Sequence, residues 1–393
     1  MMGLKSWKIA RIRGVDVNLH ISLLLLLPYL VLAIGSRFGS VARDAGVSAE
    51  ALSFGAWGWG FICALGLFAS ILIHEFGHVM VAQTQGTRVD GVTLMMLGGL
   101  STMDRPPERP FAEFRLAIIG PLVSLALAGY FLALESASTQ PDLKFLGFWL
   151  SRTNLALAVF NLLPAFPMDG GRALRSLLAV KRGQLKATQT AVKVSTVFAW
   201  SFGVMGALSL NIILLLIAFF IFAGAQTELA FLLSRGLLKG IRAGDVAIEV
   251  SPIAENQNLI ACADRMIKER QTVLPVITTS GESALVSLGR IRTIPSEFRD
   301  TTRVRDIMSV VRRSLDKQEA ISDALSELAT SPGGSLPVTS DGKIIGIVRA
   351  ADLNEVLQLK RLEESAILSF GTHVGEPTGV TTEPSEKSGG KAA

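Results

Sequence analysis

The residues of this 393-residue chain best suited to chemistry are His74, Glu75 and His78, which follow the spacing His-Glu-x-x-His. Residues four positions apart share one face of a helix, so both imidazoles can bind one metal ion. Glu75 can then reach a water molecule held by that metal, as in zinc hydrolases. The alternative is a hydrogen-bonded polar knot between helices. The segment 57–82 favours the metal, because it is otherwise almost free of ionisable side chains, and such groups within a membrane are costly and usually functional.

A zinc hydrolase needs a third protein ligand, and Asp169 has the most distinctive setting among the remaining acidic residues. It ends an apolar stretch that Pro164 and Pro167 interrupt, and a Gly-Gly pair follows it. Proline breaks a helix, and irregular backbone at membrane depth is tolerated only where it is buried in protein or lines a wet cavity. We therefore expect Asp169 to be presented to a buried metal. The alternatives are a helix cap or an ion pair with Arg172.

Together, His74-Glu75-x-x-His78 and Asn161-x-x-Pro164-x-x-Pro167-x-Asp169-Gly170 resemble the site-2 protease family of intramembrane zinc metalloproteases, over about residues 1–235. The resemblance implies one Zn²⁺ per chain, held by His74, His78 and Asp169, with Glu75 as general base. It also implies a transmembrane protein substrate, such as an anti-sigma factor. Asn161 matches a family residue near the substrate carbonyl, where its amide could stabilise an oxyanion. The alternative for Asn161 is a hydrogen bond across helices.

Apolar stretches predict the membrane helices that would carry these residues. They cover residues 19–35, 57–82, 116–134, 145–163 and 194–227. The last is awkwardly long for one span, and Gly203, Gly206 and Asn211 indicate a turn within it, so we expect two helices there and about six spans in all. The segment 86–103 is apolar and strand-like, and its Gly98-Gly99 pair matches a family feature in a membrane-dipping β-hairpin. We expect the edge of this hairpin to pair with an unwound substrate, the alternative being a buried structural strand.

The net charge of +5 is mainly a topology signal. Lysine and arginine gather before the first stretch and after the fourth, so the positive-inside rule places both termini in the cytoplasm. We expect a multi-pass protein of the cell membrane, in contact with the lipid bilayer. Nucleic acid is not an expected partner, because the basic residues flank apolar helices.

The C-terminal part has a soluble composition and contains two similar units, predicted at 242–300 and 301–360. Leu274-Pro275-Val276 and Leu336-Pro337-Val338, each followed by a second strand, resemble paired CBS domains, which have an α/β fold and commonly bind adenine nucleotides. Residues 372–393 are predicted to be a disordered tail.

The CBS resemblance also points to ribose contacts, through a hydroxyl residue and an Asp three positions later. The second unit has Asp352 without the hydroxyl, and the first has Ser287 without the Asp. A nucleotide sensor and a purely structural or dimerising module both remain open, and the latter would make the chain a homodimer.

The expected protein is therefore a polytopic α-helical membrane protein with tandem α/β CBS domains. Its expected function is intramembrane zinc proteolysis of membrane-tethered regulatory substrates, modulated by the CBS pair. The alternative is a metal-ion transporter with a CBS regulatory module, which would need further ligands along a path across the membrane.

Overall fold

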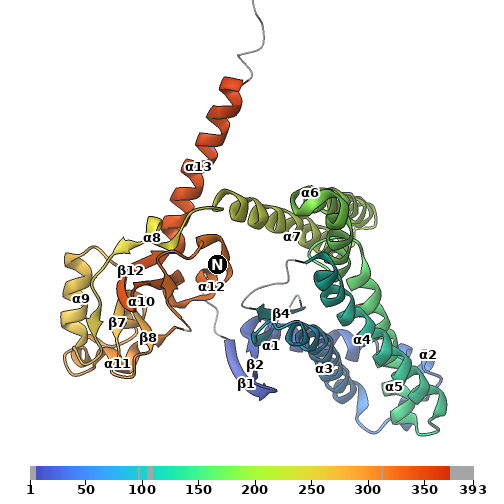
Figure 1. Cartoon of the computed structure of the whole chain (residues 1–393). Helices are drawn as coiled ribbons and strands as arrows, with labels where there is room; N and C mark the ends of the chain where they lie inside the picture. The colour runs from blue at the N-terminus through green and yellow to red at the C-terminus, as the bar shows by residue number, and fades with distance from the viewer. Residues whose placement is uncertain (1–5, 96–97, 104–108, 312, 372–393) are drawn as a thin grey trace, which may run out of the picture. The chain divides into compact units, whose positions relative to one another are not determined.

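The computed structural model describes residues 6–95, 98–103, 109–311 and 313–371 (Figure 1). The chain divides into two compact units, Met1–Leu233 and Ser234–Ala393. The predicted boundaries at residues 235, 242, 300 and 360 stay predictions, and the predicted tail lies outside the described residues.

The first unit consists of helices and one small sheet (Figure 1). Its main helices are α1 (Ile21–Ser36), α2 (Phe38–Asp44), α3 (Gly55–Thr84), α4 (Pro110–Ala137), α5 (Pro141–Leu162), α6 (Asp169–Leu208) and α7 (Ile212–Leu237). A short 3₁₀ turn, Ala49–Ala51, precedes α3. Helices α4 and α5 are consecutive, are joined by a short loop and pack closely against each other.

Among the described residues, four helices are long and apolar enough to cross a membrane, namely α3, α4, α6 and α7. The pair α1 and α2, bent by 62°, would add a fifth. Six spans are therefore not confirmed. Helix α5 does form over the predicted fourth span, but it contains the polar run Ser151-Arg152-Thr153-Asn154, which lowers its hydropathy.

The last apolar stretch divides into two helices, as its turn residues predict. Helix α6 ends at Leu208 and α7 begins at Ile212, with the Asn211 side chain accepting from the amides of Ile213 and Leu214. Inside α6, Gly183 has a φ of 72°, which interrupts the helix before the predicted apolar stretch begins at residue 194. The preceding portion, from Asp169 to this interruption, is helical, and the sequence analysis did not predict a helix there.

A four-stranded sheet at the N-terminal end of the chain was only half predicted. Its order is β1-β2-β3-β4, built from β1 (Ser6–Ile12), β2 (Val15–His20), β3 (Val89–Met95) and β4 (Gly98–Met103). Strands β2 and β3 are parallel, and the other neighbours are antiparallel. The tight turn Arg13-Gly14, both with positive φ, joins β1 to β2 and is the signal the sequence analysis missed.

The second compact unit, Ser234–Ala393, contains two α/β repeats, each built on a four-stranded sheet. The sheet orders are β6-β7-β8-β9 and β10-β11-β12-β5. The strands are β5 (Ile248–Glu249), β6 (Ile253–Ala254), β7 (Val273–Ile277), β8 (Ser283–Ser287), β9 (Ser309–Val310), β10 (Leu315–Asp316), β11 (Ser335–Ser340) and β12 (Lys343–Arg349). The helices are α8 (Ala243–Val246), α9 (Leu259–Lys268), α10 (Leu288–Arg292), α11 (Val304–Ile307), α12 (Leu325–Thr330) and α13 (Ala350–Gly371), with 3₁₀ turns at Ser296–Phe298, Ile321–Asp323 and Pro332–Gly334.

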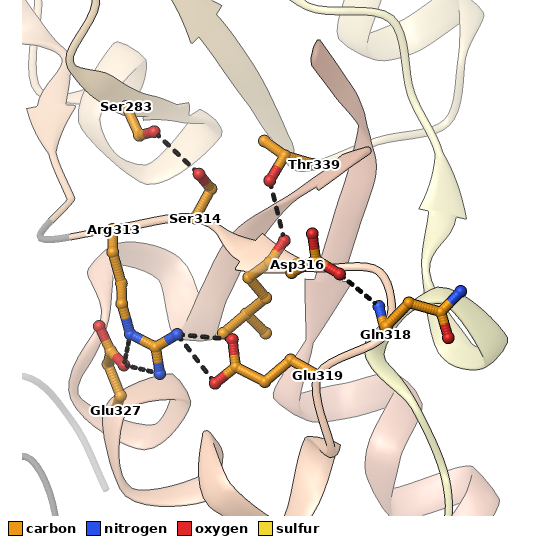
Figure 2. A network of polar contacts seen from close by, with 9 residues as sticks. Ser283, Arg313, Ser314, Asp316, Gln318, Glu319, Glu327 and Thr339 are labelled. Atoms are coloured by element: carbon orange, nitrogen blue, oxygen red, sulfur yellow. Dashed lines mark hydrogen bonds and ion pairs between the residues drawn. The ribbon is translucent and has the colours of Figure 1, made fainter. Parts of the chain in front are cut away.

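The two repeats exchange short strands, which joins them into one body. Strand β5, from the part predicted as the first CBS domain (242–300), pairs with β12 of the second, and β9, from the part predicted as the second (301–360), pairs with β8 of the first. Figure 2 shows polar contacts of Arg313 and Ser314, which lie between β9 and β10. Arg313 binds Glu319 at 2.7 Å and Glu327 at 3.1 Å, and Ser314 lies within hydrogen-bond distance of Ser283 in the first repeat.

Candidate metal centre

Helix α3 places His74 and His78 on one buried face, as their spacing predicts. Their residues are only 4% and 7% exposed. Their Nε2 atoms lie 3.3 Å apart. Two imidazole nitrogens this close, in an apolar helix, form two corners of a binding site.

Asp169 supplies the third corner. It opens α6 after the broken segment that contains Pro164 and Pro167, and its Oδ2 lies 3.2 Å from Nε2 of both histidines. The turn before it is tight, because a Cβ on Gly171 would lie 2.6 Å from the backbone of Ala165. Asp169 is therefore at the start of a helix and also against the two imidazoles. The described ion pairs of its carboxylate are with these histidines.

This triangle fits a zinc ion. Zn²⁺ binds nitrogen and oxygen ligands at roughly 2.0–2.2 Å in a tetrahedron, which puts neighbouring ligand atoms about 3.3–3.5 Å apart. The three distances of 3.2, 3.2 and 3.3 Å come close to that spacing. Among the described residues, His74, His78 and Asp169 are the one group of at least three potential ligands with atoms within 4.8 Å of one another.

Helix α4 holds the far side of both imidazole rings. Nδ1 of His74 lies 2.9 Å from Oγ of Ser124, and Nδ1 of His78 lies 2.7 Å from the carbonyl oxygen of Leu116. A carbonyl only accepts, so Nδ1 of His78 donates and its Nε2 carries a lone pair towards the metal position. The sequence analysis missed Ser124 and Leu116. The available signal was Pro121, which lies between them in α4, because a proline inside a helix marks an irregular backbone.

Gly120 leaves the room that the imidazoles need. A Cβ at this position of α4 would lie 2.5 Å from Nε2 of His74 and closer still to Nε2 of His78. Real Cβ atoms do not approach other atoms so closely, so only glycine allows α4 to pack directly over the two metal-facing nitrogens.

Glu75 lies beside the β4 strand. It is partly buried, and a Cβ on Gly99 would lie 2.5 Å from its carboxyl carbon and 2.6 Å from Oε1. Gly99 pairs with Leu94 in the hairpin formed by β3 and β4. Among the described residues β4 is at the edge of the sheet, so the proposed general base is next to a strand that has one described neighbour. The membrane association of this hairpin stays a prediction.

Asn161 lies near the end of α5, and its amide donates to the carbonyl of Leu157 in the same helix at 3.0 Å. The bond that the structure gives this amide therefore lies within α5, and a bond across helices stays a prediction. Its role towards a substrate stays a prediction.

The two predicted nucleotide contacts in the second unit already have internal partners. Both carboxylate oxygens of Asp352 accept from Arg349, at 2.7 and 2.6 Å, and Asp352 raises the pKa of Arg349. Oγ of Ser287 accepts from the amide of Arg290 and caps α10. Ribose hydroxyls would therefore compete with Arg349 for Asp352.

Comparison with known proteins identifies both parts of the chain. The model of "Peptidase family M50" matches residues 62–140 and 133–202, and that of "CBS domain" matches residues 304–359. The chain is 30% identical over 370 residues to "Zinc metalloprotease MJ0392" of Methanocaldococcus jannaschii, covering 91% of this chain and 98% of the relative. It is 30% identical over 375 residues to "Putative zinc metalloprotease Rip3" of Mycobacterium tuberculosis, covering 91% and 94%.

Among solved structures, "Site-2 Protease from Methanocaldococcus jannaschii" is similar, with 32% identity and a TM-score of 0.42, covering 57% of this chain and 95% of that one. The similarity to the archaeal relative extends over nearly the full length of both sequences, and the chain has the His-Glu-x-x-His helix and the matching Asp169. The chain therefore belongs to peptidase family M50, the site-2 protease family of multi-pass membrane zinc metalloproteases, and carries a CBS domain.

Proposed function

We propose that the chain is an intramembrane endopeptidase that hydrolyses peptide bonds within transmembrane segments of membrane-tethered regulatory proteins, such as an anti-sigma factor. The observation that carries this proposal is the convergence of His74, His78 and Asp169 on one point, with Glu75 beside them on the membrane-spanning helix α3. A site in such a helix acts on peptide bonds that are themselves within the membrane.

The side chains of the site have three different roles in the proposed reaction. His74, His78 and Asp169 hold one Zn²⁺ per chain, which when bound supplies Lewis-acid activation of water and of the scissile carbonyl. Glu75 accepts the proton of the attacking water and returns it to the leaving amine. Asn161 donates to the developing oxyanion, after its amide turns from the carbonyl of Leu157.

A transmembrane substrate must unwind before attack, because the backbone amides of a helix are bonded within it. The side of β4 that has no partner among the described residues can take up the unwound segment as an added strand, and a Cβ on Gly99 of β4 would collide with Glu75. Strand β3 cannot do this, because β2 and β4 already flank it. A cysteine at Ser101 of β4 should therefore cross-link to a cysteine near the scissile bond. A cysteine at Ser6 of β1, on the opposite edge, is the control and should not.

The second unit is proposed to modulate the protease by binding an adenine nucleotide with Asp352 and Ser287, and to dimerise the chain. Both termini are proposed to be cytoplasmic. Titration of the cleavage rate with nucleotide tests the regulatory role, and light scattering tests dimerisation. An unchanged cleavage rate at saturating AMP and ATP would remove the regulatory role.

The decisive experiment compares the purified chain with Glu75→Gln on a defined transmembrane substrate in vesicles. We expect zinc to bind both proteins and only the unaltered chain to cleave. Equal cleavage by both would refute Glu75 as the base. Zinc flux into vesicles without cleavage would support the transporter instead, although the described residues contain one group of at least three potential metal ligands.

A further inference from the structure

Arg175 is a largely buried arginine that contacts two neighbouring helices from its own. It lies on α6, six residues after Asp169, and its side chain is only 11% exposed. The guanidinium donates to Glu113 of α4, with Nε 2.9 Å from Oε1, and also pairs with Glu228 of α7. One cation therefore fixes α6 against both neighbouring helices.

The same guanidinium also reaches the segment on the other side of Asp169. It lies over the ring of Phe166, 5.2 Å from the centroid. Phe166 is 1% exposed and precedes Asp169 by three residues, in the segment between the two prolines. Its amide donates to Oγ of Ser195 at 2.7 Å. Arg175 thus holds the chain just before Asp169 through a ring contact and just after it through its own helix.

The Glu113 contact leads directly to the histidines. Glu113, Leu116, Gly120 and Ser124 recur along α4 at spacings of three and four residues, so they share one face of the helix. On that face the Leu116 carbonyl holds His78, the Ser124 hydroxyl holds His74, and Gly120 leaves room for both rings. The ion pair of Arg175 with Glu113 therefore joins the helix that carries Asp169 to the helix that orients the histidines.

Lysine could not make this set of contacts. The planar guanidinium bonds two carboxylates and lies over a ring at once, whereas an ammonium is a point charge without a flat face. Arg152 of α5 provides a comparison within the same bundle. It pairs with Glu135 of α4 and lies over Phe148, 4.0 Å from the centroid, but the contacts that the structure gives it are with α4 and α5, away from the Asp169 segment.

We propose that Arg175 is a positioning residue of the metal centre, which sets Asp169 at bonding distance from His74 and His78 through Phe166 and Glu113. This inference rests on the proposed function, because it takes these three side chains as the zinc ligands. It assigns a role to a residue that neither the motifs nor the metal geometry includes. The contacts that the structure gives Arg175 are with Glu113, Glu228 and Phe166, none of which is a proposed ligand.

The test measures metal binding and not only cleavage. Arg175→Lys and Arg152→Lys are compared in the full-length chain by chelator competition for Zn²⁺ and by the visible absorption of Co²⁺ at the site. We expect Arg175→Lys to weaken zinc binding about 10- to 100-fold, as removal of residues that support metal ligands does, and to alter the Co²⁺ spectrum. Arg152→Lys should leave both unchanged.

A purely structural role would give a different pattern. Both variants would then lower the melting temperature of the metal-free protein, with unchanged zinc affinity in the molecules that remain folded, and this would overturn the proposal. If Arg175→Lys does not fold, Phe166→Leu keeps every charge and removes the aromatic face over which Arg175 lies. It should weaken zinc binding in the same direction, and wild-type affinity in this variant would also overturn the proposal.

Asp169→Ala distinguishes a failure of this inference from a failure of the proposed function. If Asp169→Ala keeps full zinc affinity, the ligand assignment itself fails. If Asp169→Ala loses zinc while Arg175→Lys and Phe166→Leu bind it normally, the metal centre stands and only the positioning role of Arg175 fails.

Discussion

Gly120 of α4 faces His74 of α3 so closely that a Cβ at Gly120 would lie 2.5 Å from the metal-facing Nε2. Gly120→Ala should therefore push the imidazoles apart and abolish tight zinc binding, although alanine favours the helix itself by about 1 kcal/mol. Metal analysis of the purified protein checks this. Gly129→Ala is the matched control, because Gly129 is on the same helix with nothing within 4 Å of its added Cβ. Equal zinc content in the two variants would contradict this prediction, because α4 would then have shifted to make room for the added methyl group.

Gly99→Ala should impair the general base Glu75 without weakening zinc binding. The added methyl group would collide with the Glu75 carboxyl group and leave the three ligands in place. We expect normal zinc content with kcat reduced about 100-fold, since a misplacement of about 1 Å costs that much. Steady-state cleavage and metal analysis on one sample give both values. Loss of zinc together with activity would contradict the separation.

Ser124→Ala should weaken zinc binding about 10- to 100-fold, because the His74 ring loses the hydroxyl that orients it. Ser136→Ala, on the same helix, is the control, because the bond that the structure gives its hydroxyl is to the carbonyl of Leu132. Chelator competition compares the two variants. Equal affinities would mean that Ser124 does not orient the ring.

Cys262 should resist alkylation in the folded protein. Burial raises the pKa of its thiol to about 11, so at pH 8 it is protonated and unreactive. In Cys63→Ser, where Cys262 is the only thiol, we expect slow labelling that becomes fast in denaturant. The unfolded thiol ionises near pH 8.5, so this group stabilises the fold below that pH and its contribution falls between about pH 8.5 and pH 11. Rapid labelling of the folded protein at pH 8 would contradict the burial.

Arg349→Gln should strengthen adenosine binding about five- to tenfold, if ribose hydroxyls are to bond Asp352, because Arg349 occupies both carboxylate oxygens. Asp352→Asn should weaken binding. Adenosine is used so that a contact between Arg349 and phosphate cannot offset the effect. Calorimetry measures both variants, and identical affinities would remove Asp352 from the site.

The sequence by itself determined the chemistry and most of the elements. His74, Glu75 and His78 are local to one helix turn, so their spacing alone places them together. The prolines before Asp169 and the Asn211 turn are also local signals. The main strands of the second unit are short apolar runs, and the Asp341-Gly342 turn joins two of them.

Only the tertiary structure decided what surrounds the ligands. Ser124 and Gly120 meet His74 across 50 and 46 residues of chain, and Arg175 binds Glu113 across 62 residues. The pairing of β2 with β3 is parallel and joins segments about 75 residues apart, so no local pattern predicts it. Local propensity acts within a few residues, whereas these contacts depend on how whole helices and strands pack, and that packing is what turns two histidines and a distant carboxylate into one site.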